Sequence, residues 1–171
     1  MRNAMLSLKA KLCASGAAEM VRFCAEHGIP HDICGKVVVA TSDGEIPALE
    51  ELHRRGMANG VAGITIIGPE EFRELEPHAA GVRALHVPST GITDYAAVSR
   101  KYAELLTSAG GTLLTNAEVL SLRLGQECVA ETRAGTFTAS TIVNCAGLYS
   151  DRIARMAGAD PGVRIIPFRG E

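Results

Sequence analysis

The chain has 171 residues, of which 47% are apolar and 21% are charged, and its formal net charge is −2. This composition is typical of a folded globular domain and excludes a disordered or fibrous chain. Seventeen basic residues against nineteen acidic ones, with no run of Lys or Arg, give no electrostatic basis for nucleic-acid binding. No apolar stretch approaches the length of a membrane span, so we expect neither a transmembrane helix nor a signal peptide.

The cysteines indicate a reducing compartment. There are five of them, scattered along the chain without a CxxC pair or a histidine at metal-ligand spacing. The sequence therefore predicts reduced thiols, a cytoplasmic location and no metal site.

The first ninety residues predict a mixture of helices and short strands. Apolar spacing indicates a helix over residues 6–27 that ends at Gly28, just before Pro30. Ser42 and Glu45 fit a capping box that opens a helix ending near residue 59, and Pro69 fits the first position of another helix. Short apolar runs predict strands at residues 31–34, 36–40, 64–67, 85–87 and 91–93.

After residue 90 the predicted pattern alternates like a cofactor-binding sheet. Asp94 is a good N-cap for a helix that Gly110 closes, and a strand is expected at residues 112–115. Three short strands should form an antiparallel meander, before a buried strand at 141–145 in the same sheet as 112–115. The remaining elements are the meander strands at 119–124, 128–132 and 136–139, a helix at 150–157, and a strand beginning at 165.

Residues 141–151 form the most informative local pattern, an apolar strand followed by Ala146, Gly147 and a helix. Small residues at this point let another backbone or a flat ligand approach the end of a parallel strand. Ordinary packing between a helix and a strand produces the same pattern more often, so alone it does not identify a cofactor site. The meander before it favours the cofactor interpretation.

Seven segments in order resemble the FAD-dependent L-2-hydroxyglutarate oxidase and dehydrogenase family, within the D-amino-acid-oxidase-like and glycine-oxidase-like flavoproteins. The resemblance covers essentially the whole chain. The segments are residues 7–10 (SLKA), 34–36 (CGK), 39–42 (VATS), 88–92 (PSTGI), 116–119 (NAEV), 144–148 (NCAGL) with Asp151, and 167–171 (PFRGE).

The resemblance is to the central portion of that family. It implies an α/β fold: part of a FAD-binding Rossmann-like sheet with an inserted β-meander, plus the beginning of a substrate domain. The expected division is residues 1–90 for a substrate-domain portion, 91–160 for part of the FAD domain, and 161–171 for a further substrate-domain strand. The family's GxGxxG turn for the FAD pyrophosphate and its histidine near the flavin are not found here. We therefore expect these residues alone neither to retain FAD nor to be active.

The resemblance also implies cofactor-binding positions. Val119 resembles a position whose backbone faces the adenine of FAD, although a valine there can simply be a strand-core residue. Cys145, Ala146 and Gly147 resemble the small-residue turn under the cofactor. Because no cation neighbours it in the sequence, Cys145 is better interpreted as a small apolar side chain than as a redox group.

Two cations are candidates for binding a substrate carboxylate. A 2-hydroxy dicarboxylate needs Lys or Arg partners, which form charge-assisted hydrogen bonds. Lys9 lies in the SLKA motif and Arg169 in the PFRGE motif. The ordinary alternative for both is a solvated surface charge. No catalytic residue is assigned.

The implied activity is oxidation of L-2-hydroxyglutarate, or a near relative, to the 2-oxo acid by hydride transfer to flavin. Two alternatives stay open: an amine or amino-acid oxidase on the same scaffold, and a non-catalytic α/β module. The expected partners are a small 2-hydroxy dicarboxylate and, through unpaired sheet edges, a second copy of the chain. For a dehydrogenase, peripheral attachment to a membrane is the alternative to a cytoplasmic location.

Overall fold

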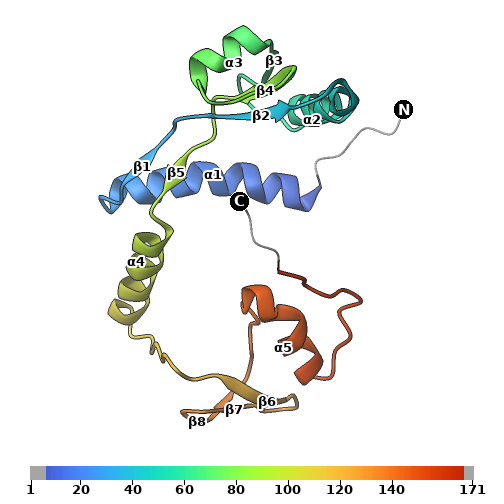
Figure 1. Ribbon diagram of the computed structural model, residues 1–171. Helices are drawn as coiled ribbons and strands as arrows, with labels where there is room; N and C mark the ends of the chain where they lie inside the picture. The colour runs from blue at the N-terminus through green and yellow to red at the C-terminus, as the bar shows by residue number, and fades with distance from the viewer. Residues whose placement is uncertain (1–6, 168–171) are drawn as a thin grey trace. The chain divides into compact units, whose positions relative to one another are not determined.

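A computed structural model describes residues 7–167. The chain divides after Ala109 into two compact units, coloured blue to yellow-green and yellow to red in Figure 1. Each unit has its own strands and helices. The first contains the larger set of elements, and the second is built around a three-stranded meander.

The first unit begins with the long helix α1 (Leu8–Glu26), as the sequence predicts. The Ser7 hydroxyl accepts a hydrogen bond from the Ala10 N–H at 3.2 Å and caps the start of the helix. The helix ends at His27, and the chain then passes through Gly28 to Pro30. Only Cys24 of this helix is buried, so most of α1 presents its side chains outside the core.

A three-stranded antiparallel sheet forms the centre of the first unit. Its strand order is β2 (Lys36–Ala40), β4 (Arg83–Val87), β3 (Thr65–Ile67). Leu49 of α2 (Ile46–Ala58) packs in a buried cluster with Ala40 and Leu85. Phe72 of α3 (Pro69–Leu75) packs with Ala84, the neighbour of Leu85. Because successive residues of a strand point to opposite faces, α2 and α3 pack against opposite faces of the sheet.

A two-stranded ribbon connects this sheet to the helices α1 and α4. It consists of β1 (His31–Asp32) and β5 (Ile92–Thr93), which pair antiparallel. The helix α4 (Tyr95–Ser108) follows directly, and its Val98 is buried with Cys24 and Ile29. This third cluster holds α4 against the end of α1.

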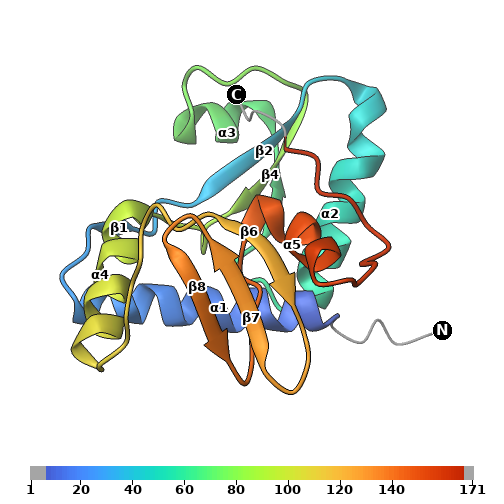
Figure 2. The same ribbon diagram turned by 90° about the horizontal axis from the view of Figure 1, so that it is seen from below.

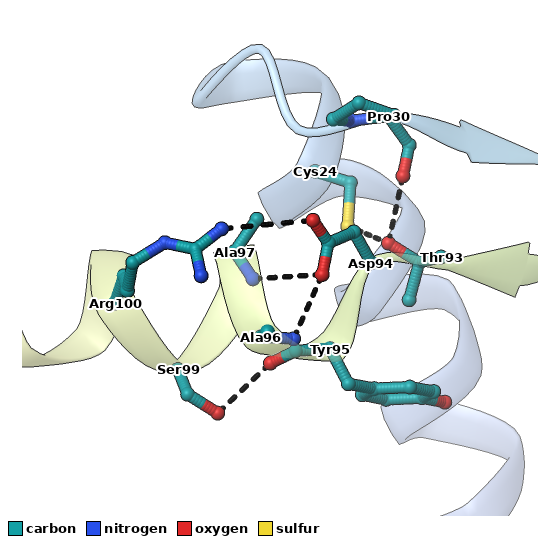
Figure 3. Close-up of polar contacts among 9 residues, drawn as sticks. All are labelled: Cys24, Pro30, Thr93, Asp94, Tyr95, Ala96, Ala97, Ser99 and Arg100. Carbon is teal, nitrogen blue, oxygen red and sulfur yellow. Dashed lines mark hydrogen bonds and ion pairs between the residues drawn. The ribbon is translucent and has the colours of Figure 1, made fainter.

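Polar contacts fix the start of α4, as Figure 3 shows. The Asp94 carboxylate accepts hydrogen bonds from the N–H groups of Ala96 and Ala97 at 2.9 and 3.0 Å, which confirms the predicted N-cap. The Thr93 hydroxyl donates to the Pro30 carbonyl at 3.0 Å and lies 3.4 Å from the Cys24 sulfur. These contacts join the ribbon to both helices.

The second unit is a meander followed by a short helix (Figure 2). The strands β6 (Val119–Arg123), β7 (Cys128–Thr132) and β8 (Gly135–Ala139) pair antiparallel in chain order, as predicted. A single 3₁₀ turn, η2 (Gly147–Tyr149), then leads into α5 (Ser150–Met156).

The strands predicted at 112–115 and 141–145 are not formed, and that part of the sequence prediction is wrong. Both segments are irregular and have no ladder partners among the described residues. Their apolar side chains are open to solvent: Leu113 is 51% exposed and Val143 is 78% exposed. A strand requires hydrogen bonding to a neighbour, and the described residues provide none beside these segments. Residues 165–167 of the last predicted strand are likewise irregular, and residue 168 lies outside the described residues.

The prediction that Ser42 and Glu45 form a capping box is wrong. Ser42 makes no side-chain cap, and a 3₁₀ turn, η1 (Asp43–Glu45), precedes α2. The Glu45 carboxylate instead accepts hydrogen bonds from the Thr41 N–H and hydroxyl at 2.7 and 2.9 Å, which lowers its pKa. The glutamate thus reaches back as predicted, but to the residue before the serine.

The compact units do not test the predicted domains, which concern a whole flavoprotein, so the divisions at 90 and 160 stay predictions. Within residues 7–167, none of the helices combines the length and the apolar character that crossing a bilayer requires.

Candidate functional site

The turn at residues 144–147 is held by the side chain of Asn144. Its amide donates to the Ser150 carbonyl at 2.8 Å, and its Oδ1 accepts from the Ala146 N–H at 3.2 Å. The Ala146 carbonyl in turn accepts from the Tyr149 N–H at 3.0 Å. One side chain therefore connects the extended segment to the start of α5. Asn144 is not among the cofactor-binding residues predicted from the sequence, although asparagine commonly bonds to the backbone two residues ahead.

Gly147 leaves open space above this turn. Its φ is +54°, in the left-handed region, and no heavy atom lies within 4 Å of the place where a Cβ would be. Ala146 is half-buried and Cys145 is exposed with a free thiol. The three predicted residues thus form one continuous, sterically open turn. A flat group can approach its backbone closely.

Val119 lies in the same compact unit, at the first position of β6. It is half-buried and pairs with Thr132, and the ladder shifts register between Val119 and Ser121. β6 is an edge strand, and among the described residues no strand pairs with its outer side. Backbone groups on such an edge can bind a ligand that carries both donors and acceptors.

Asp151 is a buried charge behind the turn. It is 5% exposed, and its Oδ2 accepts hydrogen bonds from Arg155 Nη1 at 2.8 Å and from the Ile165 N–H at 3.4 Å. Arg155 also donates to the Val163 carbonyl at 2.9 Å. The hydrogen bond from Arg155 lowers the pKa of Asp151. The pair ties the segment around residues 163–165 to α5, while Asp151 Oδ1 has no partner among the described residues.

The two predicted substrate-binding cations are not brought to this turn by any observation. Lys9 lies in the first turn of α1, in the first unit, and is exposed. It forms no ion pair with another described residue. Arg169 lies outside the described residues. Carboxylate binding by these two residues stays a prediction.

Comparison with known proteins places this geometry in a family. Residues 2–171 match the FAD dependent oxidoreductase family. L-2-hydroxyglutarate dehydrogenase of Indibacter alkaliphilus is 45% identical over 167 residues, covering 96% of this chain and 42% of the relative. The human mitochondrial protein of that name is 39% identical over 178 residues, covering 96% and 38%. The chain thus spans about two-fifths of these relatives.

Solved structures agree on the fold. L-proline dehydrogenase from P. horikoshii matches with a TM-score of 0.74 at 20% identity, over 92% of this chain and 44% of the other. L-α-glycerophosphate oxidase from Mycoplasma pneumoniae, solved with FAD bound, matches with a TM-score of 0.68 at 26% identity, over 77% and 37%. The mixed α/β fold is therefore the one predicted. The chain belongs to the FAD dependent oxidoreductase family.

Proposed function

We propose that these residues are the central part of an enzyme that oxidises L-2-hydroxyglutarate, or a closely related 2-hydroxy acid, to the 2-oxo acid. The observation that carries the proposal is the identity of 38–45% to L-2-hydroxyglutarate dehydrogenases across 96% of this chain. FAD, when bound, supplies the acceptor for the hydride that leaves C2. We assign no catalytic base among the described residues.

The residues of the second unit fit one part of FAD. The open turn at Gly147 leaves room for a flat group, and the free edge of β6 at Val119 offers backbone groups to the adenine. In this proposal Asn144 fixes the turn, and Cys145, Ala146 and Gly147 form the floor of the cofactor site. The pyrophosphate needs a Gly-rich turn between a strand and a helix, which is not present in residues 7–167.

For the substrate, we propose that Lys9 and Arg169 neutralise carboxylates. The support is their place in the SLKA and PFRGE motifs. In the intact flavoenzyme, Lys9→Met should lower kcat/KM for L-2-hydroxyglutarate by roughly tenfold if one charge-assisted contact is lost. An unchanged kcat/KM would show that Lys9 is a solvated surface charge with no part in substrate binding.

Substrate profiling of the intact, FAD-loaded enzyme tests the proposed activity. We expect reduction of an artificial electron acceptor with L-2-hydroxyglutarate and none with glycine or sarcosine. Preference for an amine would support the amine-oxidase alternative. Full FAD loading without oxidation of either class would support a non-catalytic module.

We further predict that the 171-residue chain alone does not bind FAD stoichiometrically, because residues 7–167 contain no Gly-rich turn between a strand and a helix to hold the pyrophosphate. The measurement is a visible spectrum of the purified chain and a calorimetric titration with FAD. A yellow preparation with near-equimolar flavin would contradict the prediction.

We also propose a cytoplasmic location, supported by five free cysteines. A second proposal is that the isolated chain self-associates, supported by exposed apolar side chains such as Leu113, Leu114 and Val143. Light scattering after size exclusion tests the second point. A monomer at all concentrations would refute it.

A further inference from the structure

A groove of about 1230 Å³ lies within the first unit, between α1 and the face of the sheet that also contacts α2. Small side chains such as Ala10, Cys13 and Ala17 line it from α1, and Val38 and Leu85 line it from the sheet. The groove is large enough for many ligands, since binding pockets typically measure about 300–1,000 Å³. The volume of the groove therefore does not identify a ligand. The ligand has to be inferred from the side chains that line the groove.

Lys36 is the one Lys, Arg, Asp or Glu among the residues that line this groove, all of which lie within the described range and which also include His31. It begins β2, and strand alternation places it on the same face as Val38 and Ala40, which belong to the α2 cluster. It forms no ion pair with any described residue. The groove thus has one lysine ammonium without an ion-pair partner among the described residues, on an otherwise largely apolar wall.

Residues with hydroxyl side chains lie near Lys36, at the end of the sheet where β2 begins. Lys36 pairs with Val87 of β4, and the Gly35 N–H donates to the Thr90 carbonyl at 2.8 Å. This pairing brings Ser89 and Thr90, both groove residues, next to Lys36. Tyr95, 67% exposed, also lines the groove, and its ring points away from the Asp94 carboxylate cluster in Figure 3. None of these hydroxyls donates a hydrogen bond to another described residue.

We propose that this end of the groove binds a carboxylate of a small organic acid, with the Lys36 ammonium as its anchor and neighbouring hydroxyls as further donors. A carboxylate matches the unpaired charge, and the apolar walls suit the hydrocarbon chain of such an acid. The identification of the acid as a 2-hydroxy dicarboxylate rests on the proposed function. Lys9, the cation predicted from the SLKA motif, is not among the groove residues.

Direct binding tests the site without flavin or turnover. Glutarate, a dicarboxylate that cannot be oxidised at a hydroxyl, is titrated into the ¹⁵N-labelled 171-residue chain. We expect amide shifts at Gly35, Lys36, Ser89 and Thr90, with affinity at least roughly tenfold weaker in Lys36→Met. Lys36→Arg should retain binding, and Lys11→Met, an exposed α1 lysine outside the groove lining, is the matched control. Equal affinity in wild type and Lys36→Met, or shifts confined to other residues, would overturn the inference.

Kinetics of the intact enzyme separate this inference from the proposed function. Lys36→Met should raise KM for L-2-hydroxyglutarate by roughly tenfold with a smaller change in kcat and unchanged FAD content. If wild type oxidises the substrate and Lys36→Met keeps a normal KM, the inference fails and the proposed function stands. If wild type does not oxidise it but glutarate binding depends on Lys36, the proposed function fails and the carboxylate site stands.

Discussion

The two units of the chain differ in how their apolar side chains are covered. Among residues 7–167, all buried apolar side chains except Cys128 belong to the first unit, where they form three clusters around α2, α3 and α4. The second unit has one buried charge, Asp151, and exposes Leu113, Leu120 and Val143. The first unit also exposes large apolar side chains, such as Leu12 and Met57, so the two units differ chiefly in what they bury.

The two units therefore obtain their stability from different interactions. In the first unit, helices cover both faces of the sheet, and apolar burial is the main stabilising term. The second unit depends on the hydrogen-bond ladder of its meander and on the pair between Asp151 and Arg155. A loss of apolar volume should therefore matter in the first unit, and a loss of charge in the second.

Truncation of Phe72 should have the largest effect. This side chain is fully buried between α3 and the sheet, and Phe72→Ala should lower the free energy of unfolding of the first unit by about 3–5 kcal/mol. Phe137→Ala in β8, where the ring is 41% exposed, is the matched control and should cost under about 1 kcal/mol. Hydrogen exchange of peptides from residues 36–87 and 119–139, followed in denaturant, measures both. Equal losses would remove the contrast between the units.

Asp151 should give an intermediate, pH-dependent effect in the second unit. Because its pKa is lowered in the fold, the ionised carboxylate stabilises the unit above its unfolded pKa of about 3.9. That contribution is lost as the pH falls through the lower, folded value. Asp151→Asn should therefore speed exchange at residues 150–166 at pH 7, and its difference from wild type should shrink on acidification. A difference that is constant from pH 7 to pH 3 would show that the charge is not responsible.

Asp94 should give the smallest effect of the three. Asp94→Ala removes the N-cap of α4 and should cost about 1 kcal/mol. The ion pair with Arg100, 3.6 Å apart and exposed, should add little. Ser99→Ala is the control, since its hydroxyl bonds only the Tyr95 carbonyl one turn earlier (Figure 3). Thermal unfolding of both variants measures the difference, and a loss for Ser99→Ala as large as that for Asp94→Ala would show that the cap is not the cause.

Local signals in the sequence predicted most of the elements. Asp94 caps α4 as expected, Pro69 begins α3, and the three meander strands lie within a residue or so of their predicted bounds. Each of these depends on interactions between residues close in sequence. The prediction at Ser42 shows the limit of such signals, because Thr41 competes successfully for the same glutamate.

The sequence did not predict features that depend on contacts between residues far apart in the chain. The apolar segments at 112–115 and 141–145 have strand-like composition, but a strand exists only with a partner, which composition does not specify. Of the candidate site, the turn at 145–147 follows from its small residues, whereas the position of Lys36 in a groove depends on where α1 lies. That information is tertiary and has no local signature.

The ribbon of β1 and β5 also makes the central sheet a separable module. The segment that contains the central sheet begins after Gly35 and ends before Thr90. The Gly35 N–H donates a hydrogen bond to the Thr90 carbonyl at 2.8 Å. At Gly91 the approach is so close that a Cβ would lie 2.5 Å from the Asp32 carbonyl. A segment whose ends meet can be exchanged or enlarged without changing the distance between α1 and α4. A different segment could therefore be inserted between these two points while α1 and α4 keep their packing.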